Sequence, residues 1–158
     1  MEEYTLRPAG PADIPILVEH RKCMFRDMAA LKGESHSEEA LEVMGAAFGA
    51  FIGAHFTDGS LSAWIFEKDG QPVASGELLI VPWLPSPRDP VGRVPYVHNI
   101  YTLPEHRRRG LARRIMEVII AHCREAGFTL VKLHASQEGR PLYESLGFTA
   151  NNEMRLNL

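Results

Sequence analysis

The amino-acid sequence predicts a mixed α/β domain, and three observations lead to this prediction. Apolar residues recur at helical spacing over the first third of the chain, and strand patterns begin at Leu61. An Asp-Gly turn signal between two β-rich runs indicates an antiparallel hairpin. A strand, a long amphipathic helix and another strand then follow in order, which predicts a crossover and therefore one parallel strand pair.

The length and composition of the chain are those of an ordinary globular domain. With 158 residues, it could bury roughly 68 to 70% of its unfolded surface in one core. The hydrophobic share of 45% and the charged share of 23% exclude disordered and fibrous classes, and no repeat is visible. We therefore expect a single domain over residues 1–158.

The N-terminal region predicts a short strand over residues 4–8 and then two helices. Asp13 can cap the first helix, which is expected to end before Lys32. Ser35 and Glu38 match a capping box at the start of the second helix.

The middle of the chain predicts β structure followed by an irregular segment. Residues 61–68 and 72–81 form the two arms of the expected hairpin around the Asp-Gly turn. The proline-rich segment 82–95 is expected to lack regular structure, and its role stays open between a functional rim and a stiff solvent loop.

The C-terminal half predicts further alternation of strands and helices. The expected elements are a strand over 96–102, a helix from Leu111 that Gly127 ends, a strand over 130–135, a short helix within 139–147, and a last strand over 153–158.

Charge is concentrated in one short stretch of the chain. The net charge of the chain is −3, but the stretch 107–114 contains five arginines: Arg107, Arg108, Arg109, Arg113 and Arg114. The rest of the chain is therefore acidic. A basic spot on an acidic body suits a small polyanion better than an extended duplex, so we expect no nucleic-acid partner.

The arginine-rich loop has the features of a phosphate site. The loop follows a β-rich run and Pro104, and it leads into the most amphipathic helix of the chain. The unpaired backbone N–H groups of the first helical turn and the positive end of the helix dipole would therefore face a ligand at the loop. Gly110 removes a side chain where a ligand would approach. Neither the P-loop pattern nor the G-x-G-x-x-G fingerprint occurs, which favours a diphosphate ligand bound at a loop with one glycine.

Metal, redox and membrane roles find no support in the sequence. Cys23 and Cys123 lack metal or CxxC spacing and are expected to be free thiols, and the seven histidines form no zincin-type pair. The N-terminus has no apolar signal core and no run approaches 18 apolar residues. We expect a cytoplasmic protein without a metal and without a membrane partner.

The sequence resembles the GNAT superfamily of N-acetyltransferases in the order of elements over almost the whole chain, and most clearly from Asn99 to Phe148. The family's [QR]-x-x-G-x-[GA] loop matches Arg107, Gly110 and Ala112. The resemblance implies a mostly antiparallel central sheet with one splayed parallel strand pair and flanking helices. It also implies that acetyl-CoA is the co-substrate, with its pyrophosphate on the loop amides, including those of Arg108, Arg109 and Leu111, and its pantetheine arm along Ile100, Tyr101 and Thr102.

A second match to the family is the segment YESLGF, which begins at Tyr143. The resemblance implies that Tyr143 protonates the departing CoA thiolate, and a phenol with a pKa of ~10 is suited to this step. Ser136 and Gly139 stand where asparagine and alanine are common in the family. Ser136 can still bond to the pantetheine or to the short helix.

The group that takes the proton of the attacking amine is left open by the sequence. His98 is the catalytic candidate that we name, and strand alternation places it on the face of Tyr96 and Ile100. Glu77, His134 and a water chain are alternatives.

The resemblance as a whole implies an N-acetyltransferase that works by direct transfer in a ternary complex. Its acceptor would be a primary amine on a small molecule or a peptide, and a homodimer is possible. The alternative is a CoA-binding regulatory or nucleic-acid-binding module on the same fold, without turnover.

Overall fold

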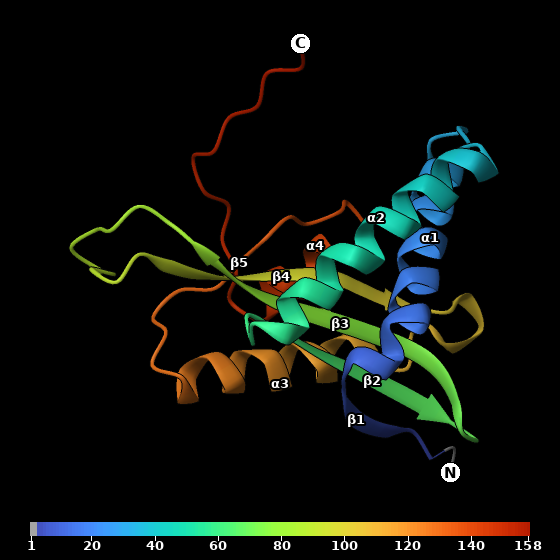
Figure 1. The fold of residues 1–158 in the computed structure, drawn as a ribbon, viewed down its shortest axis with the longest axis horizontal. Helices are drawn as coiled ribbons and strands as arrows, with labels where there is room; N and C mark the ends of the chain where they lie inside the picture. The colour runs from blue at the N-terminus through green and yellow to red at the C-terminus, as the bar shows by residue number, and fades with distance from the viewer. Residues whose placement is uncertain (1–2) are drawn as a thin grey trace.

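The computed structural model describes residues 3–158, which form one sheet with helices on both faces (Figure 1). The strand order is β1-β2-β3-β4-β5, and every neighbouring pair is antiparallel except the parallel pair β4–β5. The predicted fold class is therefore confirmed. The strands are β1 Thr5–Ala9, β2 Leu61–Lys68, β3 Gln71–Pro82, β4 Arg93–Thr102 and β5 Lys132–Leu133.

The helices divide between the two faces of the sheet. Helices α1 and α2 lie side by side over one face, and α3 runs along the other (Figure 1). Both N-terminal helices appear as predicted, but Ser37 rather than Ser35 caps α2, with its Oγ accepting from the N–H of Ala40 at 3.1 Å. The helices are α1 Ile14–Leu31, α2 Glu38–Thr57, α3 Leu111–Glu125 and α4 Arg140–Ser145, with short 3-10 turns at Pro11–Asp13 and Pro104–His106.

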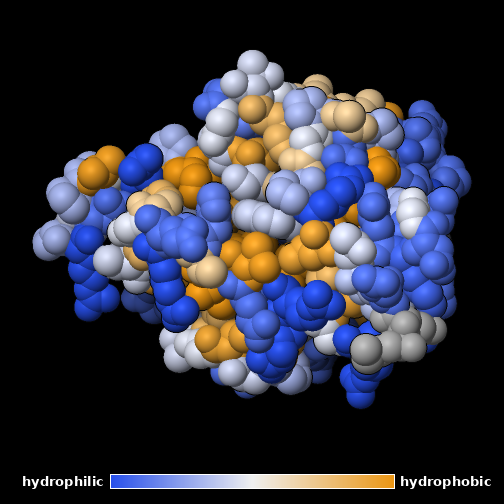
Figure 2. All heavy atoms as spheres, turned by 90° about the horizontal axis from the view of Figure 1, so that it is seen from below, coloured by the Kyte–Doolittle hydropathy of each residue, from blue (hydrophilic) through white to orange (hydrophobic). Residues whose placement is uncertain are grey.

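Strand alternation gives the sheet two apolar faces, each with its own core. On β2, Trp64 and Phe66 face α3 and pack with Ile115 and Ile119, while Ile65 faces the opposite way. The second core joins Ile65 and its neighbours on the sheet to apolar residues of α1 and α2. The sheet is thus covered on both sides. Figure 2 shows the molecule from below, with hydrophobic and hydrophilic atoms interspersed over this face.

The proline-rich segment is more regular than predicted. β3 continues through Pro82 and β4 begins at Arg93, so the expectation of no regular structure over 82–95 is wrong at both ends. Pro95 fits in a strand here because β4 has only β3 as a neighbour at that point, and pairing with β5 starts at Tyr96.

A β-bulge in β4 shapes the centre of the molecule. The register against β3 shifts between Ser75 and Glu77, and Asn99 adopts a left-handed conformation with φ of 52°. The bulge places Asn99 on the same face as His98, so Ile100 points to the α3 side. The expected common face of His98 and Ile100 is therefore wrong, because simple alternation fails at a bulge.

Gly76 lies opposite this bulge, where the sheet and α3 are closest. A Cβ atom at position 76 would come 2.5 Å from Cγ2 of Ile115 and 2.6 Å from Cδ1 of Ile100. Only glycine allows this close approach of strand to helix.

The two strands predicted at the C-terminal end are largely absent. Of the expected strand 130–135, only Lys132 and Leu133 pair, because β4 bends at the bulge and leaves Tyr96 and Val97 as their partners. The expected strand 153–158 is wrong. That segment is exposed and unpaired, and it extends away from the body of the structure (Figure 1).

Helix α2 is long and apolar enough to cross a membrane by length and composition alone. The core helix of a globular fold meets the same criteria, and here Leu41, Gly45 and Ile52 of α2 are buried against the rest of the chain. Its composition is therefore weak evidence for a membrane span.

Candidate functional site

Two cavities lie on either side of the bulge. We call the first, with a volume of about 460 Å³, the loop cavity, because it opens at the arginine-rich loop. Its walls come from α1, the end of β4, the start of α3, and the segment 136–143. The lining residues are Met24, Asp27, Met28, Leu31, Ile100, Tyr101, Thr102, His106, Arg107, Arg108, Gly110, Leu111, Ala112, Arg113, Ser136, Glu138, Gly139, Leu142 and Tyr143.

The structure brings most of the predicted cofactor residues together in this cavity. Ile100–Thr102 line it from β4, and Arg107, Arg108, Gly110, Leu111 and Ala112 line it from the loop and α3. Ser136 and Tyr143 line it from the opposite side. Arg109 belongs to the same loop but is not among the lining residues.

The N-terminus of α3 is built to receive an anion. Arg108 and Gly110 both have left-handed backbone, with φ of 63° and 79°, which turns successive N–H groups toward one side. No side chain caps the helix, and its first turn contains no acidic residue. The first N–H groups of α3 and the positive end of its dipole are therefore available to a negatively charged ligand.

Two of the arginines brace the loop. Arg107 donates from Nε to the carbonyl of Thr102 at 2.9 Å, and its Nη2 pairs with Asp27. Asp27 also accepts from the Tyr101 hydroxyl at 3.0 Å, and burial together with this carboxylate raises the pKa of Tyr101. Arg113 donates to Ser145 Oγ at 2.5 Å, which ties α3 to α4.

The last residues of β4 form an unpaired strand edge beside the loop cavity. β5 pairs with β4 only at Tyr96 and Val97, so Ile100–Thr102 has no strand on that side among the residues the structure describes. The free edge can accept an extended ligand through main-chain hydrogen bonds.

Tyr143 is held in place by a close local fit. Its ring packs edge-on to Phe148 with centroids 6.0 Å apart, and burial raises the pKa of its hydroxyl. A Cβ on residue 139 would come 2.9 Å from Cε2 of Tyr143, so the absence of a side chain at Gly139 lets the ring lie in this position. Ser136 Oγ accepts from the N–H of Gly139 at 3.1 Å, so this side chain fixes the turn before the short helix.

We call the second cavity, with a volume of about 440 Å³, the helix cavity, because α2 forms much of its wall. Most of its lining is apolar, and four polar side chains converge at its base. The apolar residues are Met44, Ala47, Phe48, Phe51, Ile52, Leu61 and Leu79, and the polar residues are Arg21, Glu77, His98 and Asn99.

The polar residues of the helix cavity form a network around the bulge. Asn99 Nδ2 donates to Glu77 Oε2 at 2.8 Å, and Arg21 Nη1 donates to Asn99 Oδ1 at 2.5 Å. Burial raises the pKa of Glu77 to about 7, although the hydrogen bond from Asn99 and the charge of Arg21 act in the opposite direction. Glu77 therefore takes up a proton more readily than an exposed carboxylate does.

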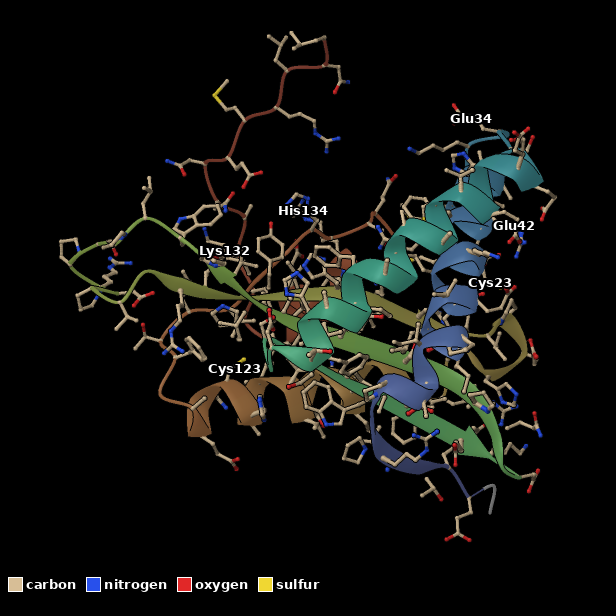
Figure 3. All side chains as sticks on the ribbon, viewed as in Figure 1. Cys23, Glu34, Glu42, Cys123, Lys132 and His134 are labelled. Carbon is tan, nitrogen blue, oxygen red and sulfur yellow. The ribbon has the colours of Figure 1, made fainter. Side chains whose placement is uncertain are left out.

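The structure separates the histidine candidates for the general base. His98 lines the helix cavity and stacks on Tyr96 with ring centroids 5.1 Å apart, and its pKa is lowered by burial and by Arg21 and His134. His134 lines neither cavity. It lies near the root of the C-terminal segment, with Nε2 3.9 Å from the Glu153 carboxylate (Figure 3).

Sequence reasoning missed Arg21, Asp27 and Asn99. Asn99 carried a usable signal, because asparagine is a poor strand former and tolerates the left-handed conformation of a bulge. Arg21 and Asp27 lie within an ordinary amphipathic helix, and nothing in the local pattern marks them.

The cysteines and other metal-binding residue types do not form a centre in the described part of the chain. Cys23 on α1 and Cys123 on α3 are free thiols far apart on the two faces of the sheet (Figure 3). Within residues 3–158, no group of three or more His, Cys, Asp or Glu side chains could hold a metal ion.

Comparison with solved structures finds close relatives of the whole chain. A GCN5-related N-acetyltransferase from Ralstonia eutropha JMP134 is 29% identical, with a TM-score of 0.87 and 99% of each chain covered. A predicted acetyltransferase from Clostridium acetobutylicum, solved with acetyl-CoA, is 26% identical with a TM-score of 0.86, covering 98% of this chain and 96% of that one.

More distant structures share the fold alone. The aminoglycoside N-acetyltransferase AAC(6')-Iy, solved with CoA, is 17% identical with a TM-score of 0.64, covering 100% of this chain and 95% of that chain. A comparison with curated proteins finds no significant match.

The family comparison agrees with the fold and with the arrangement of the loop. Residues 19–148 match the acetyltransferase (GNAT) family, a span that contains α2 and α3, the bulged strand β4 and Tyr143. The chain therefore belongs to the GNAT acetyltransferase family.

Proposed function

We propose that this protein is an N-acetyltransferase that transfers an acetyl group from acetyl-CoA to a primary amine in a ternary complex. The observation that carries the proposal is the pair of cavities that flank the β4 bulge, one lined by His98 and Asn99 and the other by Ile100. One cavity suits a long anionic donor and the other a compact acceptor. The relative from Clostridium acetobutylicum, whose structure was solved with acetyl-CoA, supports the choice of donor.

The loop cavity fits the parts of the donor in order. The N–H groups at the start of α3, from Arg108 to Ala112, would hold the pyrophosphate. The open edge of Ile100–Thr102 would pair with the pantetheine arm and bring the thioester to the bulge. When bound, acetyl-CoA supplies the activated acetyl group.

The protein's own side chains would manage the protons of the reaction. Attack by the amine places negative charge on the thioester oxygen and then on the leaving sulfur. Tyr143 lines the loop cavity and, as general acid, would donate its hydroxyl proton to that sulfur. His98 and Glu77 both line the helix cavity, where the amine must lose a proton before it attacks.

Release of free thiol in the presence of an amine panel tests this proposal. We expect thiol release from acetyl-CoA that depends on a primary amine and saturates with both substrates. The matched control replaces each amine by its acetamide, which should release no thiol. Saturable CoA binding without turnover of any amine would instead favour the CoA-binding module, and binding of nucleic acid would point to the same alternative.

A further inference from the structure

Two charged side chains of the helix cavity, the buried Glu77 and the half-buried Arg21, each have one buried atom without a hydrogen-bond partner. These atoms are Nε of Arg21 and Oε1 of Glu77, the two such side-chain atoms that the described residues contain. One is a cationic donor and the other an anionic acceptor. An unsatisfied buried group of this kind costs about 1–3 kcal/mol or more, which a ligand with complementary groups would recover.

Asn99 holds these two groups apart. Its side-chain amide accepts from Arg21 and donates to Glu77, so Arg21 and Glu77 do not pair directly with each other. The Arg21 guanidinium is further fixed over the rings of Phe48, at 4.7 Å, and Phe25, at 5.0 Å. The cavity therefore presents a positive and a negative group at separate, fixed points.

The remaining wall of the cavity selects for an apolar body. Met44, Phe48, Phe51 and Leu79 surround the space above the polar groups. A volume of about 440 Å³ is in the range of small-molecule sites. The positive charge of Arg21 at the cavity wall would repel a second ammonium group, which disfavours polyamines.

We propose that the helix cavity binds the acceptor as an apolar α-amino acid, with its ammonium against the Glu77 carboxylate and its carboxylate against the Arg21 guanidinium. This inference rests on the proposed N-acetyltransferase function. A zwitterion offsets the charges of both side chains at once.

The proton balance follows from this placement. The ammonium gives one proton to the Glu77 carboxylate, and the freed amine nitrogen forms a bond to the thioester carbon. The C–S bond breaks, and the thiolate takes the proton of Tyr143. The second amine proton restores the tyrosine through solvent, and Glu77 releases its proton to solvent, so the reaction yields amide, thiol and one proton.

The ionisation of Glu77 adds a pH signature. Arg21, His98 and Asn99 face the carboxylate, and burial dominates, so its pKa lies at about 7. A base acts when deprotonated, so kcat/KM should rise as the pH increases through 7. Glu77→Gln should lower kcat/KM for every amine and remove this rise.

Two substrates and two arginine variants test the amino-acid assignment. We expect kcat/KM for L-phenylalanine to exceed that for 2-phenylethylamine, which lacks the carboxylate, by more than about tenfold. Arg21→Gln should abolish this preference by lowering the kcat/KM for phenylalanine at least about tenfold more than the kcat/KM for 2-phenylethylamine. The control Arg26→Gln, in the same helix but lining neither cavity, should keep the preference.

Equal kcat/KM for the two amines, or a preference that survives Arg21→Gln, overturns the inference while leaving an N-acetyltransferase in place. If no amine is acetylated, the proposed function fails, and calorimetry with L-phenylalanine alone still decides the inference. Binding that is weakened by Arg21→Gln supports the amino-acid site, and absence of binding overturns it.

Discussion

Replacing Gly110 by glutamate is expected to weaken acetyl-CoA binding by at least about a hundredfold, because several charge-assisted hydrogen bonds of about 1.5–3 kcal/mol each would be lost. Gly110 has φ of 79° at the N-cap of α3, beside the N–H groups proposed to hold the pyrophosphate. A carboxylate there would occupy the anion site and repel the phosphates. Left-handed backbone at a residue with a side chain adds about 1–2 kcal/mol of strain.

Gly127 provides a matched control at the other end of the same helix. It has φ of 82°, and a Cβ would meet nothing within 4 Å, as at Gly110. Gly127→Glu therefore introduces the same charge and the same kind of backbone strain away from the loop. Calorimetric titration with acetyl-CoA should show normal affinity for Gly127→Glu, and equal affinity of both variants would remove the loop as the donor site.

The arginine-rich loop could be predicted from sequence because its information is local. A strand end, a left-handed glycine and an uncapped helix start are adjacent in the chain, and the geometry of Gly110 follows from them. The order of helices and the β2–β3 hairpin were predictable for the same reason. Their periods and turn residues are visible within short windows.

The polar base of the helix cavity could not be predicted in this way. It depends on the register of β4 against β3, and the bulge at Asn99 reverses the faces that simple alternation assigns. Arg21 reaches the same point from α1, a contact between residues 78 positions apart. Neither the register nor this contact has a signature in any single segment.

The segment 153–158 is predicted as a strand from its pattern but has no neighbouring strand in the structure. Its alternating pattern is that of a strand, but a strand also requires a neighbour to hydrogen-bond with. An alternating sequence pattern indicates that a segment prefers an extended conformation, but it does not indicate whether a neighbouring strand is present to pair with it.

Replacing Tyr143 by phenylalanine is expected to lower kcat about a hundredfold, the order of effect of a general acid. The affinity for acetyl-CoA should stay within about threefold, since the ring still packs against Phe148 and beside Gly139. The pH profile gives a second readout. Burial raises the pKa of Tyr143, so an acid at this position keeps its proton through neutral pH and loses it only at a more alkaline pH than an ordinary tyrosine does.

The kcat of the unchanged protein should therefore decrease at high pH. The Tyr143→Phe variant should not show this decrease. Tyr4→Phe is the control, because it removes a tyrosine hydroxyl bonded to His106 from a residue that lines neither cavity. Its kcat should equal that of the unchanged protein. If Tyr143→Phe also retains full kcat across the pH range, the proton reaches the leaving sulfur from water, and Tyr143 serves only to shape the wall of the loop cavity.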